Sequence, residues 1–201
     1  MHIKAELQLL EYGWFPFGKG EIRADVVGSS RIQPLAWLDR GDLRRVWGYA
    51  ITANLPLHIS QRMAAHATTL LASAGLTARV DMETVTAANA GAALFLAIEY
   101  GNGRGGVIAM GQRGKPSETV AEEAVAALLE FHRSDAAVDA HLADQLILPA
   151  ALASGPSVLA VERVTRHLTT ISWLVQQFGI ARVDVTVHGR LNLVTITPGG
   201  C

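Results

Sequence analysis

Cysteine, charged residues and long apolar runs are scarce in this 201-residue chain, and each scarcity excludes a class of protein. The single cysteine, Cys201, is the last residue, so an internal disulfide and a cysteine-based zinc cluster are excluded. No apolar run approaches the ~20 residues that cross a bilayer, and the first residues lack the layout of a signal peptide. We therefore expect a cytoplasmic protein with no membrane partner.

Charge is low and balanced. Charged residues make up 17% of the chain, and 17 basic against 18 acidic side chains give a formal net charge of −1. A protein that binds a long nucleic acid through many phosphates is usually more basic, so any RNA contact is expected to be local, as at a strand end. The 50% of hydrophobic residues predict a globular protein with a substantial core. Composition alone favours a small-molecule enzyme.

The chain begins with a predicted hairpin. Residues 3–11 alternate apolar and polar side chains, which is typical of a half-buried strand, and residues 21–26 form a second such run. The loop between them contains Gly13, Gly18 and Gly20, which permit backbone conformations closed to other residues. A structural turn is the plain interpretation. Phosphate binding is the alternative, although the loop matches neither the Walker nor the dinucleotide pattern.

Residues 42–132 are predicted to form a unit with its own helices and strands. Amphipathic helices are expected over 59–74, which ends at Gly75, and from Ser117 as the N-cap to Phe131. Strands are expected over 46–53, 77–82, 92–100 and 106–110, and residues 101–103 (GNG) predict a tight turn between the last two. Two helices and four strands are enough for this block to fold as a unit.

Residues 138–177 are predicted to form a helix, a short strand and a second helix. His141, Asp144 and Gln145 fall off the apolar stripe of the first helix, at a spacing that stacks them on one face, where they could hold one ligand or form a merely solvated cluster. After a strand at 157–161, His167 lies in the first turn of the second helix, where unpaired amides and the helix dipole favour an anion. The apolar positions of that helix extend to Phe178.

The remaining features have plain interpretations. Strands over 180–187 and 191–196 predict a closing hairpin. The other histidines are scattered, and no spacing of His, Cys or Glu predicts a metal site. The four tryptophans are interpreted as core or interface aromatics in preference to base-stacking platforms; they are Trp14, Trp37, Trp47 and Trp173.

Four stretches together resemble one known family. Residues 13–21 read GWFPFGKGE, residues 111–118 read GQRGKPSE, residues 139–149 read DAHLADQLILP, and residues 165–170 read TRHLTT. In this order they resemble the C-terminal part of the RNA 3'-terminal phosphate cyclases. The resemblance runs along nearly the whole chain, which makes it far more specific than any single motif.

The resemblance implies an α+β fold of two parts. Residues 1–41 and 133–201 would be parts of a larger catalytic domain built from repeated sheet-and-helix units, and residues 42–132 would be a smaller inserted α+β domain. The family's N-terminal Gly-Glu-Gly-Gly-Gly motif, with its metal and triphosphate ligands, has no counterpart in this sequence. The resemblance therefore implies a truncated or split form, completed by a separate N-terminal half or by self-association.

The resemblance also implies a reaction and its site. Cyclases of this family use ATP to convert an RNA 3'-phosphate into a 2',3'-cyclic phosphate through a histidine-AMP intermediate. His167 matches the nucleophile, Asp144 and Gln145 match positions that line the nucleotide pocket, and His141 stands where the family often has an adenine-stacking tyrosine. ATP, Mg²⁺ or another divalent cation, and RNA 3'-phosphate ends are the expected cofactors and partners, with the metal ligands outside this chain.

Two other functions stay open at this point. The chain could be a non-catalytic relative that acts as an RNA-associated scaffold, although a histidine at position 167 argues against that. It could also be a small-molecule transferase on a similar repeated α+β fold, like the enolpyruvyl transferases. Those enzymes need basic clusters for anionic substrates, and the sequence has none at suitable spacing.

Overall fold

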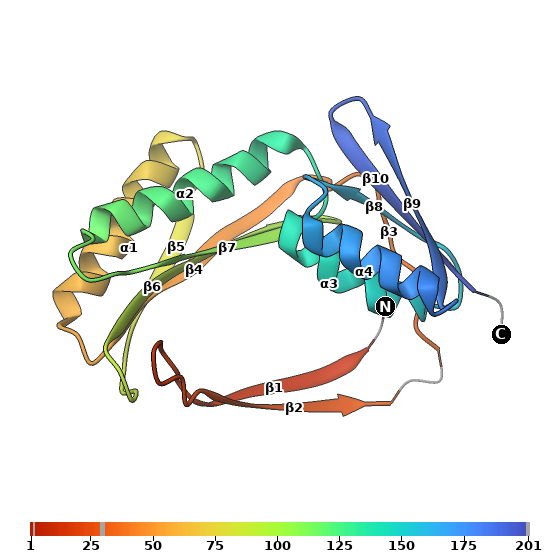
Figure 1. The fold of residues 1–201 in the computed structure, drawn as a ribbon. Coiled ribbons are helices and arrows are strands. Elements are labelled where there is room, and N and C mark those ends of the chain that lie inside the picture. The colour runs from red at the N-terminus through yellow and green to blue at the C-terminus, as the bar shows by residue number, and fades with distance from the viewer. Residues whose placement is uncertain (2, 29–30, 200–201) are drawn as a thin grey trace.

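A computed structural model describes residues 1, 3–28 and 31–199 and shows an α+β protein made of a hairpin and two sheet-and-helix units (Figure 1). Cys201, the terminal thiol, lies outside the described residues. Among the helices of the described part, none is long and apolar enough to cross a membrane.

The predicted N-terminal hairpin is confirmed, whereas the expectation of a half-buried first strand is wrong. Strands β1 (Lys4–Glu11) and β2 (Glu21–Val27) pair antiparallel and form a sheet of their own, in which every strand residue is exposed. Gly13 is required by packing, because a Cβ atom there would lie 2.2 Å from the Gly20 amide nitrogen. The loop end of the hairpin contacts the next unit: Trp14 packs against Ala53 and Ala93, and the Tyr12 hydroxyl donates to Oε1 of Glu83 (2.7 Å). The two strands themselves lie apart from the body (Figure 1).

The middle unit has the elements that the sequence predicts. They are β4 (Leu43–Ala53), α1 (Leu57–Ser73), β5 (Ala78–Val85), β6 (Gly91–Tyr100), β7 (Arg104–Met110) and α2 (Ser117–Ser134), with strand order β5-β4-β6-β7. The β4 and β5 strands are parallel and joined by α1, and the other pairs are antiparallel. Ser117 is not the N-cap as predicted. Pro116 takes an extended ψ of 148° and occupies the cap position, so the helix begins only after it.

Both helices of this unit cover the same face of its sheet (Figure 1). Alternate residues of β4, such as Val46 and Ala50, are buried with Met63 and Leu71 of α1 and Leu128 of α2. Because side chains alternate along a strand, the residues between them point to the other face, which no helix covers.

The second unit is built from the chain after residue 134 together with one short earlier strand. Its elements are β3 (Ala36–Trp37), α3 (Ala140–Ala151), β8 (Ser157–Val161), α4 (Arg166–Gln177), β9 (Ala181–His188) and β10 (Leu191–Pro198). The strand order is β3-β8-β10-β9, with β3 parallel to β8 and the other pairs antiparallel. Helices α3 and α4 pack against this sheet around Ile147, Leu168 and Val194.

This unit departs from the sequence analysis at one strand and one buried position, and it places one tryptophan outside the core. The two-residue strand β3 was not predicted, because such a short segment carries no periodicity. Phe178 was expected on the buried stripe of α4 but is 77% exposed, because the helix ends at Gln177 and Phe178 is its C-cap. Trp173 is not a core residue: it is 56% exposed, since the buried residues of α4 are Leu168, Ser172 and Val175.

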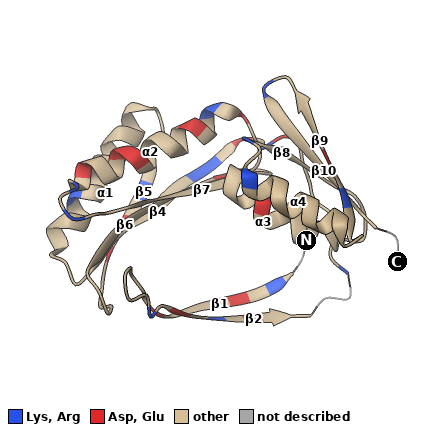
Figure 2. Ribbon diagram, viewed as in Figure 1, with Lys and Arg blue, Asp and Glu red and all other residues tan. Residues whose placement is uncertain are grey.

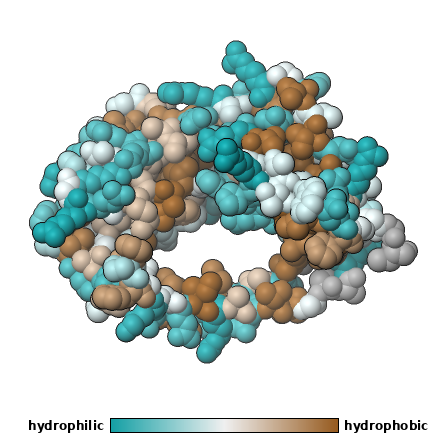
Figure 3. Space-filling view, viewed as in Figure 1, coloured by the Kyte–Doolittle hydropathy of each residue, from teal (hydrophilic) through white to brown (hydrophobic). Residues whose placement is uncertain are grey.

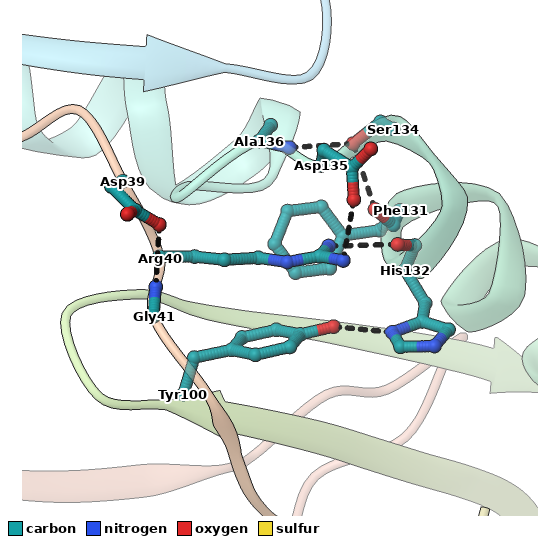
Figure 4. A network of polar contacts seen from close by, with 9 residues as sticks. All are labelled: Asp39, Arg40, Gly41, Tyr100, Phe131, His132, Ser134, Asp135 and Ala136. Carbon is teal, nitrogen blue, oxygen red and sulfur yellow. Dashed lines mark hydrogen bonds and ion pairs between the residues drawn. The ribbon is translucent and has the colours of Figure 1, made fainter.

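The two segments that join the units are held together by Arg40 (Figure 4). Its guanidinium donates to the carbonyl oxygen of His132 (Nη1–O 2.7 Å), pairs with Asp135 (Nη2–Oδ1 2.7 Å) and lies 4.4 Å from the centre of the Tyr100 ring. The Tyr100 hydroxyl lies 2.5 Å from Nδ1 of His132. Burial raises the pKa of Tyr100, and burial together with the Arg40 charge lowers the pKa of His132. Arg40 thus joins the chain before the middle unit to the chain after it.

Candidate active site

The first turn of α3 is fixed by Asp139, a buried carboxylate. Its Oδ1 atom accepts hydrogen bonds from the amides of His141 (2.7 Å) and Leu142 (2.9 Å), which is the expected role of an N-cap residue. Its Oδ2 atom accepts from the amide of Gly106 on β7 (3.1 Å). One side chain therefore attaches the start of α3 to the edge strand of the middle unit.

A cleft of about 700 Å³ opens where α3 meets that edge strand. His141 and Gln145 line it from α3, and Trp47, Phe95 and Arg104 line it from the sheet of the middle unit. The helical spacing thus correctly placed His141 and Gln145 on one exposed face, while Ala143 and Ile147 are buried on the other. Asp144 is half-buried and does not line this cleft. The structure therefore brings two of the three predicted α3 residues together.

His167 lies on the neighbouring helix. Thr165 is the N-cap of α4, with its Oγ1 atom 3.0 Å from the amide nitrogen of Leu168, so His167 is in the first turn as predicted. Its side chain is exposed and does not turn into the core. It does not line the cleft that contains His141 and Gln145. Helices α3 and α4 lie side by side (Figure 1), and a shared site for the three residues stays a prediction.

Charge in this region is mixed. Acidic and basic residues are interspersed along the ribbon in the view of Figure 2. Within the cleft, Arg104 and Arg163 lie among the carboxylates of Glu99, Glu130 and Glu162. Across the described part of the chain, no three His, Cys, Asp or Glu side chains are grouped so that they could hold a metal ion.

Comparison with known proteins assigns the chain to a family. Residues 38–133 match the RNA 3'-terminal phosphate cyclase insert domain. An RNA 3'-terminal phosphate cyclase of Methylococcus capsulatus is 52% identical over 186 residues, which are 92% of this chain and 52% of that protein. The chain belongs to the RNA 3'-terminal phosphate cyclase family. Cyclases of Nostoc punctiforme (45% identical over 95% of this chain and 55% of that protein) and Methanopyrus kandleri (33% over 92% and 54%) are further relatives.

The chain spans about half the length of these cyclases. The insert-domain match covers the middle unit, so the cleft lies between the cyclase insert domain and helix α3. The sheet of the insert domain forms one wall of the cleft and helix α3 forms the other. Arg40 joins the chain segments that connect these two parts.

Two cleft residues were missed from the sequence. Glu162 and Arg163 directly follow strand β8. The Glu162 Oε2 atom accepts from the amide of Ala140 (3.3 Å), and burial raises the pKa of this carboxyl group. The Nη1 atom of Arg163 lies 3.8 Å from Oε1 of Glu130. Their position immediately after a buried strand was the available signal, because side chains at strand ends often reach a site.

The aromatic wall of the cleft was also missed. Trp47 was interpreted as a core or interface residue, but it is half-buried on the sheet face without helices. The alternation of β4, with Val46 and Gly48 buried and Trp47 and Tyr49 not, was the signal that could have found it.

Proposed function

We propose that this chain provides part of an RNA 3'-terminal phosphate cyclase that uses ATP to convert an RNA 3'-phosphate into a 2',3'-cyclic phosphate. The observation that carries the proposal is the match to proteins named as such cyclases over more than nine-tenths of the chain. The exposed position of His167 in the first turn of α4 supports it, because a nucleophile must be accessible and first-turn amides favour a phosphate.

In the proposed reaction, a neutral imidazole nitrogen of His167 attacks the α-phosphorus of ATP, and the bond to pyrophosphate breaks. The RNA 3'-phosphate oxygen then attacks the same phosphorus and takes the AMP from the histidine. The neighbouring 2'-hydroxyl attacks the activated 3'-phosphorus, loses its proton, and displaces AMP. Each step replaces one phosphorus bond by another, so no further reactant is needed.

The nucleotide would be held by α3. In this proposal the His141 ring stacks on adenine, with less area than a larger aromatic ring provides, Gln145 donates to or accepts from the nucleotide, and the Asp144 carboxylate accepts from it. The cleft at His141 and Gln145, about 700 Å³, is within the range of volumes that hold small-molecule ligands. A divalent cation is expected to assist, but among the described residues no three His, Cys, Asp or Glu side chains are grouped so that they could hold it.

The relatives are about twice as long as the chain, so activity is tested in two forms. The chain is incubated with labelled ATP, magnesium and a 3'-phosphorylated oligonucleotide, alone and with a supplied polypeptide that corresponds to the rest of a relative. We propose that the added polypeptide, or a second copy of the chain, completes the pocket. Activity would then appear or rise in the supplemented reaction.

The role of His167 is tested by trapping labelled AMP on the protein. His167→Ala should abolish the labelling, whereas His188→Ala, which removes another exposed histidine at the end of β9, should leave it unchanged. Equal labelling of wild type and His167→Ala would refute the assigned role. RNA binding without any nucleotide turnover would favour the non-catalytic scaffold.

A further inference from the structure

One face of the insert-domain sheet is open and carries three aromatic side chains. Trp47 makes edge-to-face contacts with Tyr49 (ring centres 5.8 Å apart) and with Phe95 (5.5 Å). Tyr49 is 40% exposed, and the neighbouring Ile108 on β7 is 64% exposed. This face points away from α1 and α2 and toward the β1–β2 hairpin (Figure 1). In the space-filling view an opening, lined in part by apolar surface, separates that hairpin from the body (Figure 3).

The aromatic group is held in place by polar contacts. The indole nitrogen of Trp47 donates to Oε1 of Glu99 (3.2 Å), and Arg45 binds the same carboxylate through two nitrogens (2.8 and 3.0 Å). The Arg45 guanidinium also lies 5.5 Å from the Trp47 ring centre. An edge-to-face contact occupies at most one face of one ring, so ring faces stay available for a further planar group. A rigid, partly exposed aromatic surface of this kind is what stacking of bases requires.

This surface is continuous with the candidate active site. Trp47, Phe95 and Ile108 line the cleft from the sheet, and His141 and Gln145 line it from α3. Arg104 lies at the same edge, with its guanidinium 5.4 Å from the Trp37 ring centre. Arg104 is exposed. The hydrogen bonds from Arg45 lower the pKa of Glu99, and the charge of Arg104, the cross-strand partner of Glu99, lowers it further without a direct ion pair between Arg104 and Glu99 among the described residues. Aromatic rings beside an exposed arginine complement a single strand, whose bases stack and whose phosphates are anionic.

We propose that the open face of the insert-domain sheet, formed by Trp47, Tyr49, Phe95, Arg104 and Ile108, binds the single-stranded RNA that precedes the reacting 3' end. The inference rests on the proposed function for the identity of the strand. It assigns to the insert domain the nucleotides upstream of the terminal phosphate, and to α3 and α4 the terminal phosphate and ATP. A single platform of stacked bases reads no sequence, so binding by this face is expected to be tolerant of sequence.

The test is the affinity of the full chain, without ATP, for fluorescein-labelled, 3'-phosphorylated oligouridylates by fluorescence anisotropy. An octanucleotide should bind more tightly than a dinucleotide, because the longer strand contacts more of the sheet. Tyr49→Ala should weaken octanucleotide binding at least about fivefold, since stacking contributes ~1 kcal/mol or more per base. Tyr49→Phe keeps the ring and should bind as wild type does. Arg104→Ala should also weaken the octanucleotide and reduce the salt dependence by about one phosphate contact.

Phe178→Ala is the matched control, because Phe178 is an exposed aromatic residue on α4, outside this face. It should leave octanucleotide binding unchanged. Equal binding of the octanucleotide by wild type and Tyr49→Ala, or no preference for the octanucleotide over the dinucleotide, would overturn the proposal. A further outcome would also overturn it. If the added polypeptide that corresponds to the rest of a relative protects this face from hydrogen exchange and abolishes RNA binding, a protein segment is the occupant of the face.

The two proposals fail separately. If the surface binds RNA but His167 carries no AMP, Tyr49→Ala still weakens the octanucleotide while labelling is absent from every variant. If His167 carries AMP but the sheet does not bind RNA, labelling is normal and Tyr49→Ala has no effect on the octanucleotide.

Discussion

Replacing Arg40 by alanine should destabilise the protein by about 2–4 kcal/mol of unfolding free energy, since one side chain joins the insert domain to the second unit. The hydrogen bond from its guanidinium to the His132 carbonyl (2.7 Å) contributes about 1.5–3 kcal/mol as a charged donor. The Asp135 side chain is 78% exposed, so that ion pair adds no more than ~1 kcal/mol. The contact with the Tyr100 ring at 4.4 Å adds about 0.5–2 kcal/mol. These contributions are not additive, because they share one side chain.

Urea denaturation followed by circular dichroism measures the loss. Arg40→Lys keeps the charge, but one ammonium group cannot reach both acceptors in the same geometry, so it should lose about half as much. Arg190→Ala, at an exposed turn residue between β9 and β10, should stay within ~0.5 kcal/mol of wild type. If Arg40→Ala unfolds at the same urea concentration as Arg190→Ala, the network in Figure 4 does not stabilise the junction.

Two further predictions concern pH. Burial lowers the folded-state pKa of His132 from 6.5, so the unfolded chain takes up the proton first as the pH falls. The contribution of His132 to stability should therefore be complete above pH 6.5 and decrease below it. When the urea midpoint is measured over a series of pH values, His132→Gln should reduce this decrease. A wild-type midpoint that rises below pH 6.5 would contradict this. Burial raises the folded-state pKa of Glu162 from 4.5, so its contribution is present below pH 4.5 and lost as the pH rises through the raised pKa. The Glu162→Gln variant should therefore have a higher urea midpoint than wild type at neutral pH and a similar midpoint near pH 4. A lower midpoint for the variant at neutral pH would show that the folded protein favours the charged form of Glu162.

Features with a local cause could be predicted from the sequence. The β1–β2 hairpin follows from alternation and glycine, α1 ends before Gly75, whose φ is +81°, and the spacing of His141 and Gln145 places both on one face of α3. Features that depend on distant pairing could not. The cleft lies where Asp139 binds the amide of Gly106, 33 residues away, and nothing in either segment specifies that partner.

Residue type alone does not show where individual large apolar side chains lie. Trp47 and Trp173 are both large and apolar, yet the first lies on an uncovered sheet face and the second on the outer side of α4. A residue type indicates how much apolar surface is available, whereas the packing of neighbouring elements decides whether it is covered. The role of Glu162 likewise depends on α3 beginning beside the end of β8, which only the folded chain shows.

The junction at Arg40 makes the insert domain a separable cassette. The chain leaves the host unit and returns to it at one point, so the two host ends already lie beside each other (Figure 4). A short turn could replace the whole cassette without stretching the host, and the cassette could be grafted into an exposed loop of another protein without distortion at its ends. Gain, loss or exchange of this module would require changes at that point and at the contacts that Asp139 and Trp14 make with it.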